Sequence, residues 1–163
     1  MSARSGPDPA SAADGPRAAP ICAGLASLTF GVRDGRTRLV QAQFKPPLLV
    51  QRALYLDDAL PDMAFVFLVN STAGILAGDQ HTIEVRAGRG CQVQVCTQAA
   101  TKIFSMPHGC ARQWVSLNVQ AGAYLEYLPD AMIPFRNAHF SQETAITVAP
   151  GLPPRLPLPP RTG

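Results

Sequence analysis

The sequence has little charge, because Asp, Glu, Lys and Arg make up only 15% of its 163 residues, against about 25% in an average soluble domain. The net charge is +3 with no basic cluster, which argues against a nucleic-acid partner. The longest apolar run, residues 63–69, is far shorter than the roughly 20 residues needed to cross a membrane. Residues 1–20 also lack the apolar segment of a secretory signal.

Cysteine is scarce, and its spacing excludes several kinds of site. The four cysteines form no Cys-x-x-Cys pair, and without a secretory signal we expect reduced thiols in the cytoplasm. His108 and Cys110 are close in sequence, but a closed metal site usually needs four regularly spaced ligands. No Gly-x-Ser-x-Gly motif is present, which argues against a hydrolase of that type.

Composition divides the chain into three zones. Residues 1–20 are rich in Ala, Pro, Gly and Ser, which predicts a disordered tail. Residues 21–149 have the patterning of a folded domain. Residues 150–163 contain six prolines, and because proline donates no backbone hydrogen bond, we expect neither helix nor sheet there.

The middle zone is predicted to be all-β. Asp34-Gly35 separates two strand-like runs and is a hairpin turn signal. Turn residues recur about every ten positions, and no helical stripe exceeds two turns. The predicted strands are 25–33, 36–44, 48–56, 63–70, 81–86, 92–98, 115–119, 124–128 and 144–148.

An internal repeat supports this interpretation. Residues 83–88, 117–122 and 146–151 share the pattern of a short strand ending in small residues and Gly, with offsets of 34 and 29. The first two copies are followed at once by another strand, which predicts antiparallel β-hairpins stacked in layered sheets. The third copy runs into prolines instead. We therefore expect an interruption near residue 150, by truncation or frameshift; the alternative is a natural tail.

A first candidate site is the loop of residues 70–79, Asn-Ser-Thr-Ala-Gly-Ile-Leu-Ala-Gly-Asp. Gly74 and Gly78 permit tight turns, and Asp79 ends the loop. No Lys-Ser/Thr pair follows the glycines, so this is no phosphate loop. The simpler alternative is a turn between strands that the Asp79 carboxylate caps.

Two further segments place charged residues beside apolar ones. Residues 97–104, Thr-Gln-Ala-Ala-Thr-Lys-Ile-Phe, contain Lys102, which needs an acidic partner if buried and none if solvated. In residues 124–135, Glu126 alternates with apolar positions, and Asp130 lies between two prolines. A carboxylate facing an apolar layer is costly unless paired; the alternative is an outward Glu126.

Four ordered segments together resemble the urease accessory protein UreD (UreH) family. They are residues 47–55, with Arg52; the glycine loop at 70–79; the Thr-Gln-Ala-Ala-Thr-Lys segment at 97–102; and Leu-Glu-Tyr-Leu-Pro-Asp at 125–130. Ala replaces a family Gly at positions 73 and 77. The resemblance covers about residues 24–148, and family members are about twice as long, so the C-terminal half is expected to be absent.

The resemblance implies a β-rich, non-enzymatic scaffold for nickel delivery to apo-urease, in complex with the accessory proteins UreF and UreG. It also implies an internal passage for transient Ni²⁺, with no tightly bound cofactor. Oxygen ligands suit such a passage because they release the ion readily. By resemblance, the passage candidates are Asp79, Glu126 and Asp130, with Lys102 balancing a buried carboxylate. Arg52, Gly74 and Gly78 are motif residues without an assigned chemical role.

Two alternatives stand beside the nickel scaffold. The chain is a non-functional or regulatory fragment of such a protein, unable to hold UreF, or it is an unrelated β-sandwich binding module. Complex formation with UreF and UreG separates scaffold from fragment. A β-sandwich module would behave as a cooperatively folding monomer.

Overall fold

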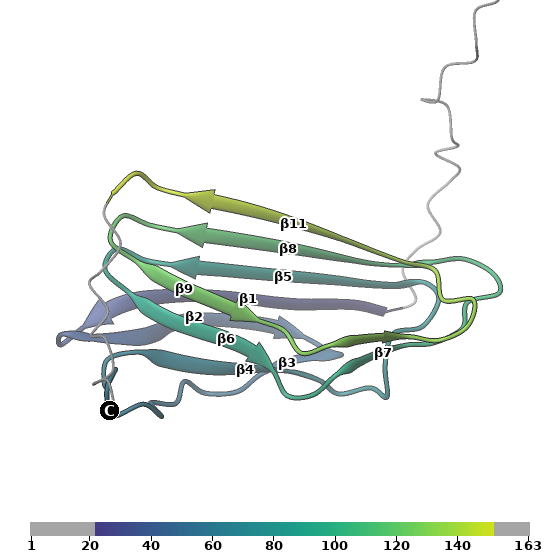
Figure 1. Ribbon diagram of the computed structural model, residues 1–163, viewed down its shortest axis with the longest axis horizontal. Coiled ribbons are helices and arrows are strands. Elements are labelled where there is room, and N and C mark those ends of the chain that lie inside the picture. Colours follow the sequence, from purple (N-terminus) through teal and green to yellow (C-terminus); the bar gives the residue numbers. More distant parts are fainter. Residues whose placement is uncertain (1–21, 152–163) are drawn as a thin grey trace, which may run out of the picture.

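The computed structural model describes residues 22–151 and contains eleven strands and no helix (Figure 1). Within these residues, no helix is present that is long and apolar enough to cross a membrane. The predicted tail at 1–20 and most of the predicted tail at 150–163 lie outside the described residues. The strands are β1 (Cys22–Arg33), β2 (Arg36–Lys45), β3 (Leu48–Val50), β4 (Ala64–Asn70), β5 (Asp79–Ala87), β6 (Gln92–Thr97), β7 (Thr101–Ile103), β8 (Ala111–Val119), β9 (Tyr124–Leu128), β10 (Met132–Pro134) and β11 (Phe140–Val148).

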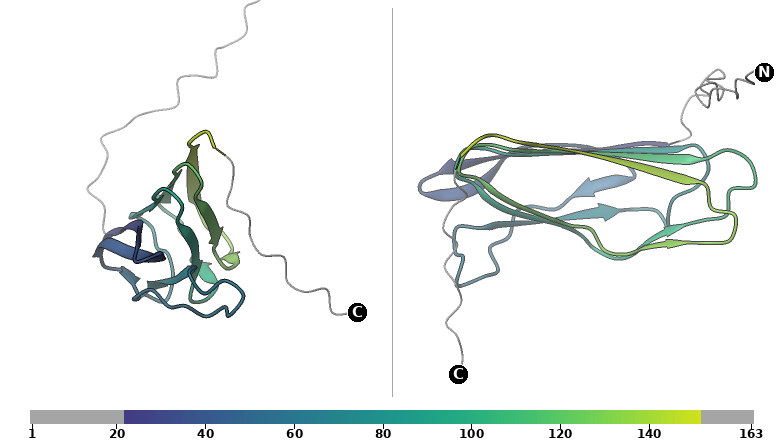
Figure 2. Two further views of the ribbon diagram at one scale, coloured as in Figure 1. Left: turned by 90° about the vertical axis from the view of Figure 1, so that its left-hand side faces the viewer. Right: turned by 45° about the horizontal axis from the view of Figure 1, so that its top comes forward.

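The strands form two facing layers, which Figure 2 shows from the side. One layer is a five-stranded sheet, sheet A, in the order β11-β8-β5-β1-β2. The other layer consists of sheet B, in the order β3-β4-β6-β9, followed along the chain by the two-stranded sheet C, β10-β7. The all-β prediction is confirmed. The sequence missed β7 and β10, and the strand predicted at 48–56 ends at Val50, with an isolated bridge at Leu54.

The predicted hairpin at Asp34-Gly35 is confirmed. β1 and β2 pair antiparallel up to Arg33 opposite Arg36. Asp34 and Gly35 both have positive φ, 53° and 74°, as a two-residue turn between twisted strands requires. This hairpin forms one end of sheet A.

The remaining strands stack as successive turns of a coil. Each turn runs through sheet B, sheet C and sheet A: β4, Ile75 and β5, then β6, β7 and β8, then β9, β10 and β11. Every strand of one turn pairs in parallel with its counterpart in the next turn. The layered arrangement is confirmed, but the pairing between repeats is parallel, where antiparallel hairpins were expected. The cause is that consecutive strands such as β5 and β6 cross between layers, so they are not neighbours in one sheet.

The register of the coil also revises the predicted repeat. Val85 pairs with Leu117, so the first offset is 32 residues, whereas the offset of 29 is observed between Leu117 and Ile146. Gly90, not Gly88, therefore occupies the place of Gly122, and both have φ of 69°. The sequence pattern matched Gly88 because two glycines lie close together after β5.

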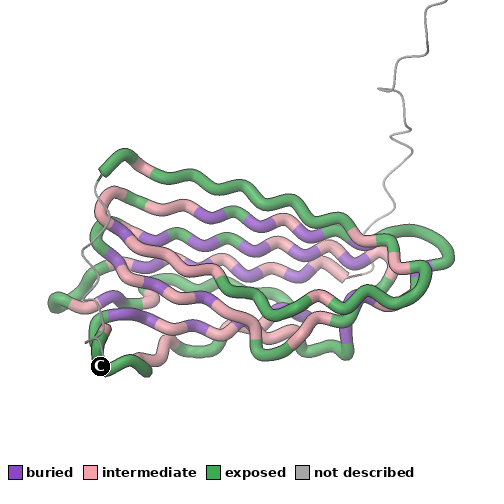
Figure 3. The backbone as a smooth tube through the Cα atoms, in the orientation of Figure 1, coloured by how far each residue is buried: buried purple, intermediate pink, exposed green. Residues whose placement is uncertain are grey.

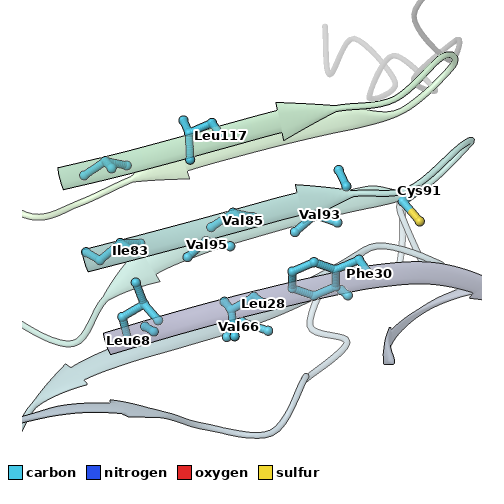
Figure 4. Packing of buried hydrophobic residues seen from close by; sticks show 14 of the residues in the cluster. Leu28, Phe30, Val66, Leu68, Ile83, Val85, Cys91, Val93, Val95 and Leu117 are labelled. Atoms are coloured by element: carbon cyan, nitrogen blue, oxygen red, sulfur yellow. The ribbon is translucent and has the colours of Figure 1, made fainter. Parts of the chain in front are cut away.

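The interior between the layers contains two apolar clusters. The larger lies between sheets A and B and is built from inward side chains such as Leu28, Val66, Val85 and Val95 (Figure 4). A smaller cluster at the sheet C end contains Ile75, Ile103, Met106 and Ala111. Burying such side chains stabilises the fold by about 25 cal/mol for each Å² of apolar surface removed from water. Burial alternates along β5 and β8, whereas β11 is exposed along most of its length (Figure 3).

Candidate functional site

A cavity of about 280 Å³ lies where the two apolar clusters separate. On one side are inward residues of sheet A, and on the other is the irregular backbone between sheets B and C. Three of the segments singled out in the sequence meet here: the glycine loop, the Thr-Gln-Ala-Ala-Thr-Lys segment and the end of β9. The polar lining residues are Asn70, Thr72, His81, Thr97, Gln98, Thr101, Lys102, Gln113, Tyr127 and Asp130.

Backbone hydrogen bonds join the glycine loop to β7. The Ile75 amide donates to the Lys102 carbonyl at 2.8 Å, and the Phe104 amide donates to the Ile75 carbonyl at 3.0 Å. Gly74, buried beside this contact, lines the cavity. Gly78 has φ of 86°, which explains the preference for glycine there. The motif glycines thus shape the loop that bounds the cavity.

Asp79 is buried, but its carboxylate is used by the loop. Its Oδ2 accepts a hydrogen bond from the Leu76 amide at 2.8 Å, as in the turn-capping alternative. Asp79 does not line the cavity. Burial lowers the pKa of His81, which lies two residues along the same inward face of β5, and the negative charge of Asp79 opposes part of that lowering.

Glu126 lies on the outer face of sheet B. It pairs in register with Gln94, whereas the inward residues Val93 and Val95 pair with Leu125 and Tyr127. The Glu126 carboxylate accepts a hydrogen bond from Tyr124, and this bond raises the pKa of the Tyr124 hydroxyl. The expectation that Glu126 faces an apolar layer is therefore wrong.

Asp130 is an exposed residue at the rim of the cavity. Its amide donates to Thr97 Oγ1 at 2.8 Å, and its Oδ1 accepts from the Ala131 amide at 2.7 Å. These bonds fix the loop after β9 against the end of β6. Of the three acidic residues predicted to line a passage, Asp130 alone contacts the cavity, and the structure does not bring the three together.

Both predicted basic residues are exposed, although Lys102 borders the cavity. Lys102 is exposed on β7 with its neighbour Ile103 buried, so it does not balance a buried carboxylate. Arg52 is exposed on the connection after β3. Ala73 and Ala77, where the family resemblance expects glycine, do not have positive φ, so the added methyl groups cause no backbone strain there.

Two polar residues that face the cavity were not among the predicted passage residues. His81 is 1% exposed and Gln113 is 8% exposed, and they are partners in register on β5 and β8. His81 Nε2 has no hydrogen-bond partner among the described residues. The sequence did contain a signal for the inward position of His81, because His81, Ile83 and Val85 are spaced two residues apart and so lie on the same face of the strand.

No preformed metal cluster is found in residues 22–151, where no three His, Cys, Asp or Glu side chains are grouped suitably. None of the four cysteines lines the cavity. The cavity therefore offers one imidazole, amide and hydroxyl groups and a rim carboxylate, which are ligands for weak rather than permanent binding of a cation.

Comparison with known proteins identifies sequence relatives of this chain. The sequence pattern of the family described as UreD urease accessory protein matches residues 23–151. Urease accessory protein UreD 2 of Streptomyces griseus is 46% identical over 132 residues, which cover 81% of this chain and 45% of the relative. UreD 3 of Methylorubrum populi is 43% identical over 131 residues, covering 80% and 42%.

The chain spans less than half the length of these relatives. The same holds for UreD of Photorhabdus laumondii, which is 39% identical over 127 residues, covering 78% of this chain and 40% of the relative. The matched segment includes every strand from β1 to β11, apart from the first residue of β1. An unrelated β-sandwich module is thereby excluded, and the chain belongs to the UreD family of urease accessory proteins.

Proposed function

We propose that the chain acts in the maturation of urease as a non-enzymatic scaffold that helps to deliver nickel to the apo-enzyme. It works in the cytoplasm in a complex with UreF and UreG, and Ni²⁺ is transient cargo rather than a cofactor. The relatives are named urease accessory proteins, which supports a helper role and not a catalytic one.

The observation that carries this proposal is the convergence of three family-like segments on one cavity. The glycine loop contributes Thr72, the second segment contributes Thr97 and Thr101, and the end of β9 contributes Asp130. A passage for a divalent ion needs a polar lining that binds weakly enough to release it. Hydroxyl and amide groups with a single rim carboxylate meet that requirement.

The acidic residues take different roles in this proposal. Asp130, at the rim, attracts the cation to the cavity. Asp79 supplies negative charge from behind the loop, because its carboxylate is close enough to act on His81. Glu126 lies on the outside of sheet B. It has a role in nickel delivery only if the ion or a partner protein approaches that face.

The test is activation of urease in cells that lack their own UreD. We expect the chain, expressed with apo-urease, UreF and UreG, to raise urease activity and the nickel content of purified urease. Asp130→Asn should lower both several-fold. Asp58→Asn, which removes an exposed acid that does not line the cavity, is the matched control. No activation by the unsubstituted chain would overturn the proposal.

A non-functional fragment is the second candidate, favoured by the coverage of less than half of each relative. It predicts a chain that does not co-purify with UreF and UreG. Co-purification of a stable complex would contradict this candidate, and absence of the complex together with absence of activation would support it.

A further inference from the structure

A row of aligned positions crosses the inward face of sheet A at the cavity. Gly24 on β1 pairs with His81 on β5, His81 with Gln113 on β8, and Gln113 with Gln142 on β11. Gln113 Nε2 donates to Gln142 Oε1 at 3.1 Å. The row therefore places two polar side chains, His81 and Gln113, in the interior between the two apolar clusters, and Gln142 continues it on the exposed strand β11.

His81 stands out in this row because its hydrogen bonding is incomplete. Its Nε2 has no partner among the described residues, although buried polar atoms are nearly always paired. Burial, which outweighs the opposing effects of Asp79 and Gln113, lowers the pKa of His81. A neutral imidazole has one nitrogen with a free lone pair, which is the form that binds metal ions.

The imidazole has room beside β1 and borders the cavity. A Cβ on Gly24 would lie 3.0 Å from His81 Cδ2, so glycine at this position makes space for the imidazole. The cavity volume of about 280 Å³ holds several water molecules, each of which takes about 30 Å³ in the liquid. Thr101 lines the same cavity from the other layer and offers a hydroxyl oxygen.

We propose that His81 is a resting point for a divalent transition-metal ion inside the cavity, with the imidazole as the one nitrogen ligand and water and side-chain oxygens as the others. Imidazole suits Ni²⁺ and its neighbours in the first transition series. One nitrogen ligand gives weak, reversible binding, in contrast to a closed site of four ligands. The choice of Ni²⁺ as cargo rests on the proposed function.

The experiment is a Ni²⁺ titration of the whole chain labelled with ¹⁵N-histidine and followed by NMR. The chain has three histidines, and His108 and His139 are exposed, so they serve as internal controls. Paramagnetic Ni²⁺ should broaden the His81 imidazole signals at lower concentration than the other two. Broadening of His108 or His139 first, with His81 unaffected, would overturn the inference.

Variants give a second measurement. His81→Gln should weaken Ni²⁺ binding in equilibrium dialysis by about tenfold or more, whereas His108→Gln and His139→Gln should leave it within twofold. Equal loss in all three variants would contradict a specific site. Because the NMR measurement uses the unsubstituted chain, the inference stays testable even if His81→Gln does not fold.

The two proposals fail in different ways. If the chain activates urease while Ni²⁺ leaves the His81 signals unchanged, the resting point is overturned and the proposed function stands. If Ni²⁺ binds at His81 but the chain gives no activation, the metal site stands and the proposed function is overturned.

Discussion

Gly74 lies so close to Lys102 that a Cβ at position 74 would come within 2.5 Å of the Lys102 carbonyl oxygen. No side-chain rotation can relieve this contact, because the obstacle is a backbone atom. The same carbonyl accepts the Ile75 amide. The glycine loop and the Thr-Gln-Ala-Ala-Thr-Lys segment are thus fitted to one another around the cavity.

Gly74→Ala should therefore separate the loop from β7 and destabilise the fold by about 1–3 kcal/mol, the usual cost of overpacking. The measurement is the free energy of unfolding in urea. Gly31→Ala is the matched control, because its Cβ would meet only the Val40 side chain, at 3.3 Å, and should change the free energy by less than about 1 kcal/mol. Equal losses in both variants would show that the backbone contact is unimportant.

A second prediction concerns the hydrogen bond that joins β2 to the start of β6. Thr37 is 2% exposed, and its Oγ1 accepts the Gln92 amide at 2.9 Å. Thr37→Val keeps the shape but leaves that amide without its acceptor, which costs about 1–3 kcal/mol. Thr147→Val, at an exposed position on β11, should be nearly neutral in the same urea titration. Unchanged stability of the Thr37 variant would mean that the amide finds another partner.

The sequence predicted the strands well where polar and apolar residues alternate. β5, β8 and the hairpin at Asp34-Gly35 follow from local chemistry, since alternation and turn residues act over a few positions. β7 and β10 have three residues each and exist because they stack on one another and on Ile75. Such contacts join residues about 30 positions apart and leave no local pattern.

Pairing direction was also beyond local reasoning. A strand, a glycine turn and another strand usually indicate a hairpin, and the residues after β5 and β8 fit that pattern. Whether the second strand folds back or crosses to the other layer depends on what covers the apolar faces. The roles of Asp79 and Glu126 in a nickel passage stay predictions. Charge and spacing in the sequence could not show that Asp79 caps a loop or that Glu126 lies on the outer face of sheet B.

The buried imidazole gives the metal-free chain a pH-dependent stability. Burial lowers the pKa of His81 from the ordinary value of 6.5, so the folded state holds the neutral form while the unfolded chain takes up a proton. The stabilisation is complete above about pH 6.5 and is lost as pH falls below it. The slope from this one group is at most about 1.4 kcal/mol per pH unit.

Urea unfolding between pH 8 and pH 5, with a chelator present, measures this effect. His81→Gln should reduce the fall in the free energy of unfolding below pH 6.5. His108→Gln and His139→Gln should leave this fall unchanged, because both residues are exposed. Asp79 faces the same interior and raises the pKa of His81, so Asp79→Asn should steepen the fall. A profile that His81→Gln leaves unchanged would place the titrating group elsewhere.

The outer edge of β11, the last strand among the described residues, predicts that this chain self-associates. Ile146 and Val148 are 64% and 66% exposed, although they continue the inward row of Leu117 and Val119 on β8. Within residues 22–151, nothing pairs with the outer edge of β11, and its nine residues carry one charge, Glu143. A long, weakly charged edge strand with exposed apolar side chains is a template for pairing with another chain.

Ile146→Lys should therefore reduce concentration-dependent association in sedimentation velocity, because pairing would bury the added charge. Val40→Lys, at a position 45% exposed on β2 at the opposite end of sheet A, should leave association unchanged. An equal effect of both lysines would mean that net charge, and not the β11 edge, governs association.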